Sequence, residues 1–152
     1  MGKLMVLGVG NLLLKDEGVG VHVAQELMKI DLPPQVEVID GGTAAFDLIP
    51  LIATADRLIV IDALQGGGEP GAIYRIAPEE ITMTKEQDVS LHDTNLIEIL
   101  NMAAIIGKKP ETVIYGIEPA EISQSMDLSE EIKGKIPILI ELIKQEISKG
   151  EK

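Results

Sequence analysis

The chain has 152 residues, of which 45% are hydrophobic and only 2% aromatic, and it carries a formal net charge of −12 without a single cysteine. This length predicts one domain over residues 1–152, with a core that aliphatic side chains fill. The charge argues against nucleic acid and anionic membranes as partners. The lack of cysteine excludes disulfides, thiolate metal sites and a cysteine nucleophile.

Four short runs of apolar or β-branched residues predict strands, at 3–9, 36–40, 57–63 and 112–117. Segments with helical periodicity lie between them. One begins near Gly18, and another runs from 129 to 149 with Pro137 as a kink or restart. No apolar run reaches the ~18 residues of a membrane span, and the one at the N-terminus is too short for a secretory signal. We therefore expect an α/β protein with a largely parallel sheet, located in the cytoplasm.

A fifth strand, predicted at 71–77, breaks this rhythm. Only the seven residues "LQGGGEP" separate it from the strand at 57–63, which leaves no room for a crossover helix. The sequence therefore predicts that this strand runs antiparallel. Its Tyr74 and Arg75 favour an edge position.

The stretch "LGVGNLLLKDEGVG" (7–20) resembles a nucleotide-binding loop, but Leu13 stands where the dinucleotide fingerprint requires its third glycine. Two acids in the loop, Asp16 and Glu17, would also repel a phosphate. Asp16 is expected to cap the helix that follows, and Glu17 suits its first turn. A nucleotide-dependent Rossmann-like enzyme thus remains only as an alternative.

Acidic residues follow three of the predicted strands. Glu17 comes after the first, Asp40 ends the second and Asp62 ends the third. Ligands of open α/β sheets bind outside the carboxyl ends of the strands. Asp62 follows four apolar residues, and a carboxylate buried there needs a partner. Together the three acids suggest a cation-binding or peptide-cleaving site.

The two histidines differ in context. His22 lies inside the first helix without neighbours at ligand spacing, and we expect it to be dispensable. The segment "SLHD" (90–93) looks like a capping box with Ser90 as N-cap, which places His92 in the first turn of a helix. The positive helix end favours a neutral imidazole that can bind a metal. Carboxylates with an imidazole suit nickel or zinc.

The motifs together resemble the maturation endopeptidases of nickel–iron hydrogenases. The opening stretch matches that family's strand, G-x-G-N and acidic pair, and four later motifs follow in the expected order: "DGGTA" (40–44), "IDA" (61–63), "SLHDTNL" (90–96) and "GIEP" (116–119). The resemblance implies a three-layer α/β/α sandwich on a five-stranded, mostly parallel sheet with one antiparallel strand. It also implies a monomer.

The resemblance further implies a function. Such enzymes cut the C-terminal extension from the hydrogenase large-subunit precursor after nickel insertion. The implied metal ligands are Glu17, Asp62 and His92, and Asp40 matches an acid near the cleft.

Without a cysteine or a serine in a nucleophile elbow, a covalent intermediate is not expected. The resemblance implies a metal-dependent endopeptidase of the group historically called aspartic-type. Asp40 and Asp62 are its predicted catalytic residues, with Asp40 as a base. The metal either belongs to the protease and activates water, or is nickel that the precursor carries, with zinc as the alternative ion. A non-proteolytic metal-binding assembly module stays open as a further alternative.

Overall fold

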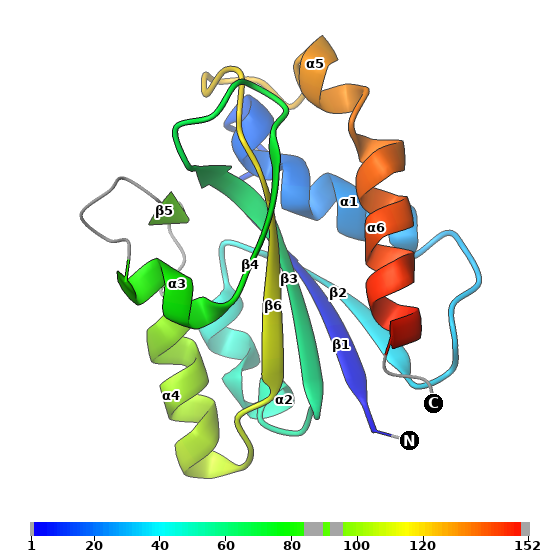
Figure 1. Ribbon diagram of the computed structural model, residues 1–152, viewed down its shortest axis with the longest axis vertical. Coiled ribbons are helices and arrows are strands. Elements are labelled where there is room, and N and C mark those ends of the chain that lie inside the picture. The colour runs from blue at the N-terminus through cyan, green and yellow to red at the C-terminus, as the bar shows by residue number, and fades with distance from the viewer. Residues whose placement is uncertain (1, 84–89, 92–95, 150–152) are drawn as a thin grey trace.

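The computed structural model describes residues 2–83, 90–91 and 96–149. Strands and helices alternate along most of the chain (Figure 1). In order, the elements are β1 (Leu4–Val9), η1 (Lys15–Gly18), α1 (Val19–Leu27), β2 (Val36–Gly42), η2 (Ala45–Leu48), α2 (Ile49–Ile52), β3 (Arg57–Gln65), β4 (Ile73–Ile76), α3 (Pro78–Met83), β5 (Ser90–Leu91), α4 (Leu96–Ile106), β6 (Glu111–Ile117), α5 (Glu130–Lys133) and α6 (Ile136–Lys149). The elements η1 and η2 are single 3-10 turns.

The main sheet has the strand order β2-β1-β3-β6-β4. Strands β1, β2, β3 and β6 are parallel, and β4 pairs antiparallel with β6. The prediction of an antiparallel edge strand at 71–77 is therefore confirmed. A short return from β3 cannot cross over a sheet face, so the chain comes back in the opposite direction.

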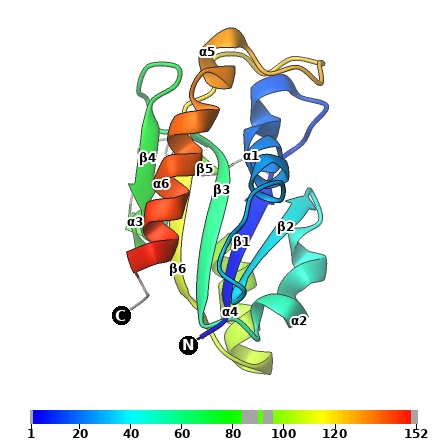
Figure 2. The same ribbon diagram turned by 90° about the vertical axis from the view of Figure 1, so that its right-hand side faces the viewer.

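Helices cover both faces of this sheet and complete the predicted α/β/α sandwich (Figure 2). Because side chains alternate along a buried strand, each strand contributes side chains to two hydrophobic cores, one on each face of the sheet. On β3, Ile59 and Ile61 pack in the core under α1, α5 and α6, whereas Leu58 and Val60 pack in the core under α2 and α4. In the part of the chain that is described, no helix combines the length and apolarity needed to cross a bilayer.

Two local predictions have different outcomes. Pro137 does mark a restart, since α5 ends at Lys133 and α6 begins at Ile136, with the proline in its first turn. The prediction of Ser90 as a helix N-cap is wrong. Ser90 and Leu91 form strand β5, which pairs antiparallel with Gln65 and Leu64 at the end of β3. Pairing with a distant strand outweighs the local capping pattern.

Candidate active site at the carboxyl edge of the sheet

Glycines allow the β1–α1 loop to lie directly on the strand ends. A Cβ atom on Gly20 would lie 2.1 Å from the Ile61 carbonyl oxygen, and one on Gly8 would lie 2.2 Å from the Gly20 carbonyl oxygen. Gly10 adopts a φ of +138°, and its Cβ would lie 2.1 Å from the Glu17 carbonyl oxygen. In the dinucleotide fold, glycines in this loop let the backbone approach a pyrophosphate closely. Here the same lack of side chains lets one part of the protein backbone pack against another.

Glu17 and Asp62 are both buried at this edge, with 3% and 0% of their surface exposed. Glu17 belongs to the turn η1, which lies against β3. Asp62 lies on β3, and its Oδ1 accepts a hydrogen bond of 2.8 Å from the Ala63 N–H. By strand alternation, Asp62 shares the sheet face of Leu58 and Val60, which α2 and α4 cover.

The third predicted ligand, His92, lies outside the described residues. Within the ranges that the structure does describe, no group of three or more histidine, aspartate and glutamate side chains is arranged to hold a metal ion. The site of Glu17, Asp62 and His92 therefore stays a prediction. The segment that contains His92 joins β5, which pairs with the end of β3, to α4, which covers the Asp62 face.

Asp40 lies at the same edge, but on the other face of the sheet. Its Oδ1 accepts from the Gly42 N–H at 3.1 Å, and its Oδ2 accepts from Gln25 Nε2 of α1 at 3.2 Å. Val36 and Val38, which share its face of β2, pack in the core beneath α1. Asp40 and Asp62 thus do not face each other, and the catalytic role of both remains a prediction.

Asp16 differs from its prediction as the cap of α1. The N-cap of that helix is Gly18, without a side-chain hydrogen bond. The Asp16 carboxylate is fully buried and accepts four hydrogen bonds, from the Ala120 and Glu121 N–H groups (both 2.9 Å), the Ser129 N–H (2.9 Å) and the Ser129 hydroxyl (2.7 Å). Asp16 therefore anchors the segment 120–129 to the β1–α1 loop.

Glu118 is a second buried anchor, to which sequence reasoning gave no role. Its Oε1 accepts from the Gly66 N–H at 2.9 Å, the Gly68 N–H at 3.2 Å and the Tyr74 hydroxyl at 2.6 Å. Burial and the Glu118 carboxylate together raise the pKa of Tyr74. The available signal was the same as for Asp62, an acid directly after an apolar strand.

His22 lies on α1 and is half-buried. It hydrogen-bonds the backbone of Met126, and burial lowers its pKa despite the nearby acids Asp127 and Glu26. Its Nε2 atom is buried and has no hydrogen-bond partner among the described residues. His22 thus contacts the segment that Asp16 anchors.

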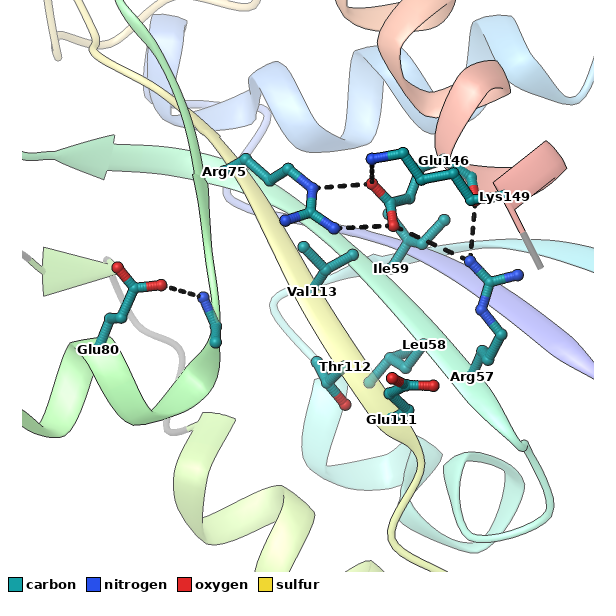
Figure 3. Close-up of a pocket in the computed structure, with 11 residues that line it drawn as sticks. Arg57, Leu58, Ile59, Arg75, Glu80, Glu111, Thr112, Val113, Glu146 and Lys149 are labelled. Carbon is teal, nitrogen blue, oxygen red and sulfur yellow. Dashed lines mark hydrogen bonds and ion pairs between the residues drawn. The ribbon is translucent and has the colours of Figure 1, made fainter.

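The opposite, amino edge of the sheet holds a cavity of about 520 Å³ beside α6 (Figure 3). Glu146, one of the residues that line it, is 5% exposed. The Glu146 carboxylate receives a bidentate pair from Arg75 (2.8 and 3.0 Å) and a 2.6 Å bond from the Tyr115 hydroxyl. Arg57 and Lys149 lie 3.9 and 3.7 Å from its oxygens.

These contacts shift the ionisation of the cluster. Arg75 is the main cause that lowers the pKa of Glu146 to about 2. Burial, followed by the Glu146 carboxylate, raises the pKa of Tyr115 to about 12. The cluster joins the end of α6 to β4 and β6, which is a structural role.

The chain as a whole matches known proteins in sequence and in fold. A family model described as hydrogenase maturation protease matches residues 21–146. The chain is 36% identical over 123 residues to the hydrogenase expression/formation protein HupD of Bradyrhizobium diazoefficiens, covering 79% of this chain and 64% of that protein. It is 31% identical over 144 residues to the hydrogenase 2 maturation protease of Escherichia coli, covering 93% and 88% of the two chains. Among solved structures, the hydrogenase maturating endopeptidase HybD from E. coli superposes with a TM-score of 0.87 at 29% identity, covering 98% of this chain and 94% of that one.

Proposed function

The chain belongs to the hydrogenase maturation protease family, and from this premise we propose that it is an endopeptidase that cuts the C-terminal extension from a nickel–iron hydrogenase large-subunit precursor. In this proposal the cut follows nickel insertion, and the enzyme acts as a monomer in the cytoplasm. The observation that carries the proposal is the burial of Glu17 and Asp62 at the carboxyl edge of a sheet with this family's fold.

The donor set fits a divalent ion. Two carboxylates, from Glu17 and Asp62, would provide negative charge and oxygen ligands, and His92 would provide an imidazole. Nickel that the precursor carries is the proposed ion, and zinc is the alternative. A site with few protein ligands leaves coordination positions open, which the precursor's own ligands would fill. Recognition of the precursor would then depend on the metal it carries.

The chain's own residues define the rest of the chemistry. A bound divalent ion would polarise the scissile carbonyl and make a bound water more acidic. The Ala63 N–H fixes the orientation of the Asp62 carboxylate through its 2.8 Å hydrogen bond. Asp40 is the proposed base. Because it lies on the other face of the sheet, it would act only on a substrate that crosses the sheet edge.

The direct test is cleavage of purified large-subunit precursor, followed by mass spectrometry of the C-terminal product. We expect Glu17→Gln, Asp62→Asn and His92→Ala to lose at least ~100-fold in cleavage rate, while His22→Ala stays within ~3-fold of the unchanged protein. Equal losses in His22→Ala and His92→Ala, with both proteins folded, would refute the ligand assignment. Precursor binding without cleavage by the unchanged protein would favour the assembly module.

A crossed mixing experiment tests the source of the metal. One mixture contains metal-free precursor with nickel-soaked, desalted protease, and the other contains nickel-loaded precursor with metal-stripped protease. We expect cleavage only in the second mixture. Cleavage only in the first would show a protease that carries its own ion. Stabilisation of the chain by nucleotides in a thermal-shift assay would instead support the Rossmann-like alternative.

A further inference from the structure

Three large apolar side chains are exposed in the β1–α1 loop and the segment 120–129: Leu13 (61%), Ile122 (36%) and Met126 (60%). A single exposed apolar residue is ordinary, but a group of them at one place marks an interaction surface. Leu13 comes from the same loop as the buried Glu17, and the other two come from the segment 120–129. We call these three residues the docking patch.

A backbone bridge brings the two segments of the docking patch together. The Ser125 N–H donates to the Leu13 carbonyl at 3.0 Å, and the Lys15 N–H donates to the Ser125 carbonyl at 2.8 Å. Leu14 and Ser125 thus form an isolated parallel bridge. Leu13 and Met126 each lie next to a bridged residue, which brings these two exposed side chains to neighbouring positions on the surface. The segments run side by side near the start of α1 in both views (Figures 1 and 2).

The protein also holds these segments in place from below. The Asp16 carboxylate fixes three backbone N–H groups between residues 120 and 129, and His22 binds the Met126 backbone. Lys15, between Leu13 and Glu17, adopts a positive φ of 51°, a conformation that persists only where the surroundings impose it. A surface ordered in advance loses less entropy when a partner binds.

Charge around the docking patch indicates what kind of partner fits. The exposed acids Glu121 and Asp127 lie next to its residues in the chain, and the whole chain carries a net charge of −12. An apolar centre with a charged rim is the usual anatomy of a protein interface. Lys15 is also close to Leu13, but the two acids and the net charge outweigh it and favour a partner with basic residues around its apolar ones.

We propose that the docking patch binds an apolar, basic-flanked stretch of the hydrogenase precursor and holds the scissile segment beside Glu17 and Asp62. This inference rests on the proposed function and adds the surface through which the substrate is held. Leu13 and Met126 act in binding alone, and they take no part in the bond-breaking step.

The test is the double variant Leu13→Ser/Met126→Ser, measured over a range of precursor concentrations. Both side chains are exposed, so folding is preserved, which circular dichroism and the melting temperature will verify. We expect KM to rise ~10-fold or more with kcat within ~2-fold, because the loss lies in substrate binding. The matched control is Met102→Ser/Ile105→Ser on α4, whose side chains are 43% and 82% exposed. It should leave KM unchanged.

A second measurement is independent of turnover. A photo-crosslinking benzoylphenylalanine at position 13 should capture the precursor, and the same group at position 105 should not. An unchanged KM in the patch variant, or no crosslink from position 13 while the protein still cleaves, would overturn the docking patch. A change in oligomeric state in place of KM would assign the patch to a second copy of the chain. If the unchanged protein cleaves no precursor, the proposed function itself fails, which is a distinct result.

Discussion

Two buried carboxylates, Asp16 at the carboxyl edge of the sheet and Glu146 at the amino edge, perform the same structural task by different means. Each ties a late part of the chain to the sheet. Glu146 is neutralised by cations, with Arg75 bound to both of its oxygens. Asp16 is held by three N–H groups and one hydroxyl, all neutral, and among the described residues no lysine or arginine pairs with it.

The difference matters because neutral donors satisfy a carboxylate without removing its charge. At the amino edge Glu146 is paired with cations, whereas Asp16, in the same turn as Glu17, is held by four neutral donors. Acids can therefore be buried in both places, and on the proposed function the carboxyl edge is the one that would receive a metal or a basic substrate.

Among these variants, Asp16→Ala is expected to give the largest loss of stability. It tests the carboxyl-edge half of the comparison. It leaves three N–H groups and the Ser129 hydroxyl without their acceptor, at a loss of ~3 kcal/mol in the free energy of unfolding. Urea denaturation measures this loss, with Asp127→Ala, an exposed acid of the same segment, as the control. A loss below ~1 kcal/mol would show that water replaces the carboxylate easily.

Glu146→Gln tests the amino-edge half of the comparison, with a smaller expected loss of ~2 kcal/mol in the free energy of unfolding. The effect is moderated because the side chains of Arg75 and Lys149 are 51% and 62% exposed and water can solvate them again. Glu141→Gln is the matched control, since Glu141 lies on the same helix and makes an exposed ion pair with Lys144 at 3.4 Å. Similar losses in both variants would contradict the role of burial.

The stability that Glu146 contributes should depend on pH, because the fold shifts its pKa. The fold lowers this pKa from 4.5 to about 2, so Glu146 adds stability above pH ~4.5 and loses that contribution as the pH falls toward 2. Between pH 5 and pH 2, the stability gap between the unchanged protein and Glu146→Gln should shrink by up to ~2 kcal/mol. Urea midpoints across this range measure the gap. A gap that stays constant would show that the ionised carboxylate contributes nothing.

Salt should give the smallest effect. Raising NaCl to ~1 M shortens the screening length to ~3 Å, which weakens the partly exposed cation contacts of Glu146. We expect the loss caused by Glu146→Gln to shrink by ~0.5 kcal/mol, while the loss caused by Asp16→Ala stays unchanged because its partners are neutral. Equal salt dependence of the two losses would remove the distinction between the edges.

Local pattern was sufficient for the sheet. Continuous apolar runs mark the strands that are buried on both faces, and a seven-residue return fixes the direction of β4 through chain length alone. The edge position inferred from Tyr74 and Arg75 is also confirmed, because β4 ends the strand order.

Long-range partners explain what the sequence did not reveal. The partners of Asp16 lie 104 to 113 positions later in the chain, and no local pattern specifies them. Ser90 matched a capping pattern, but its segment pairs with β3 instead. The burial of Glu146 could have been predicted from the sequence. It lies seven residues after Leu139 on the apolar face of α6, where a charge requires a partner.

The long separation between Asp16 and its partners has a consequence for folding. Contacts between residues more than 100 positions apart require the two ends of a long loop to meet, so we expect them to form after the local and strand-to-strand contacts. During synthesis, β1, β2 and β3 can pair before residues 120–129 leave the ribosome. The turn that carries Glu17 gains its contacts with that segment only once those residues arrive. On the proposed function, the chain would therefore acquire protease activity late in folding.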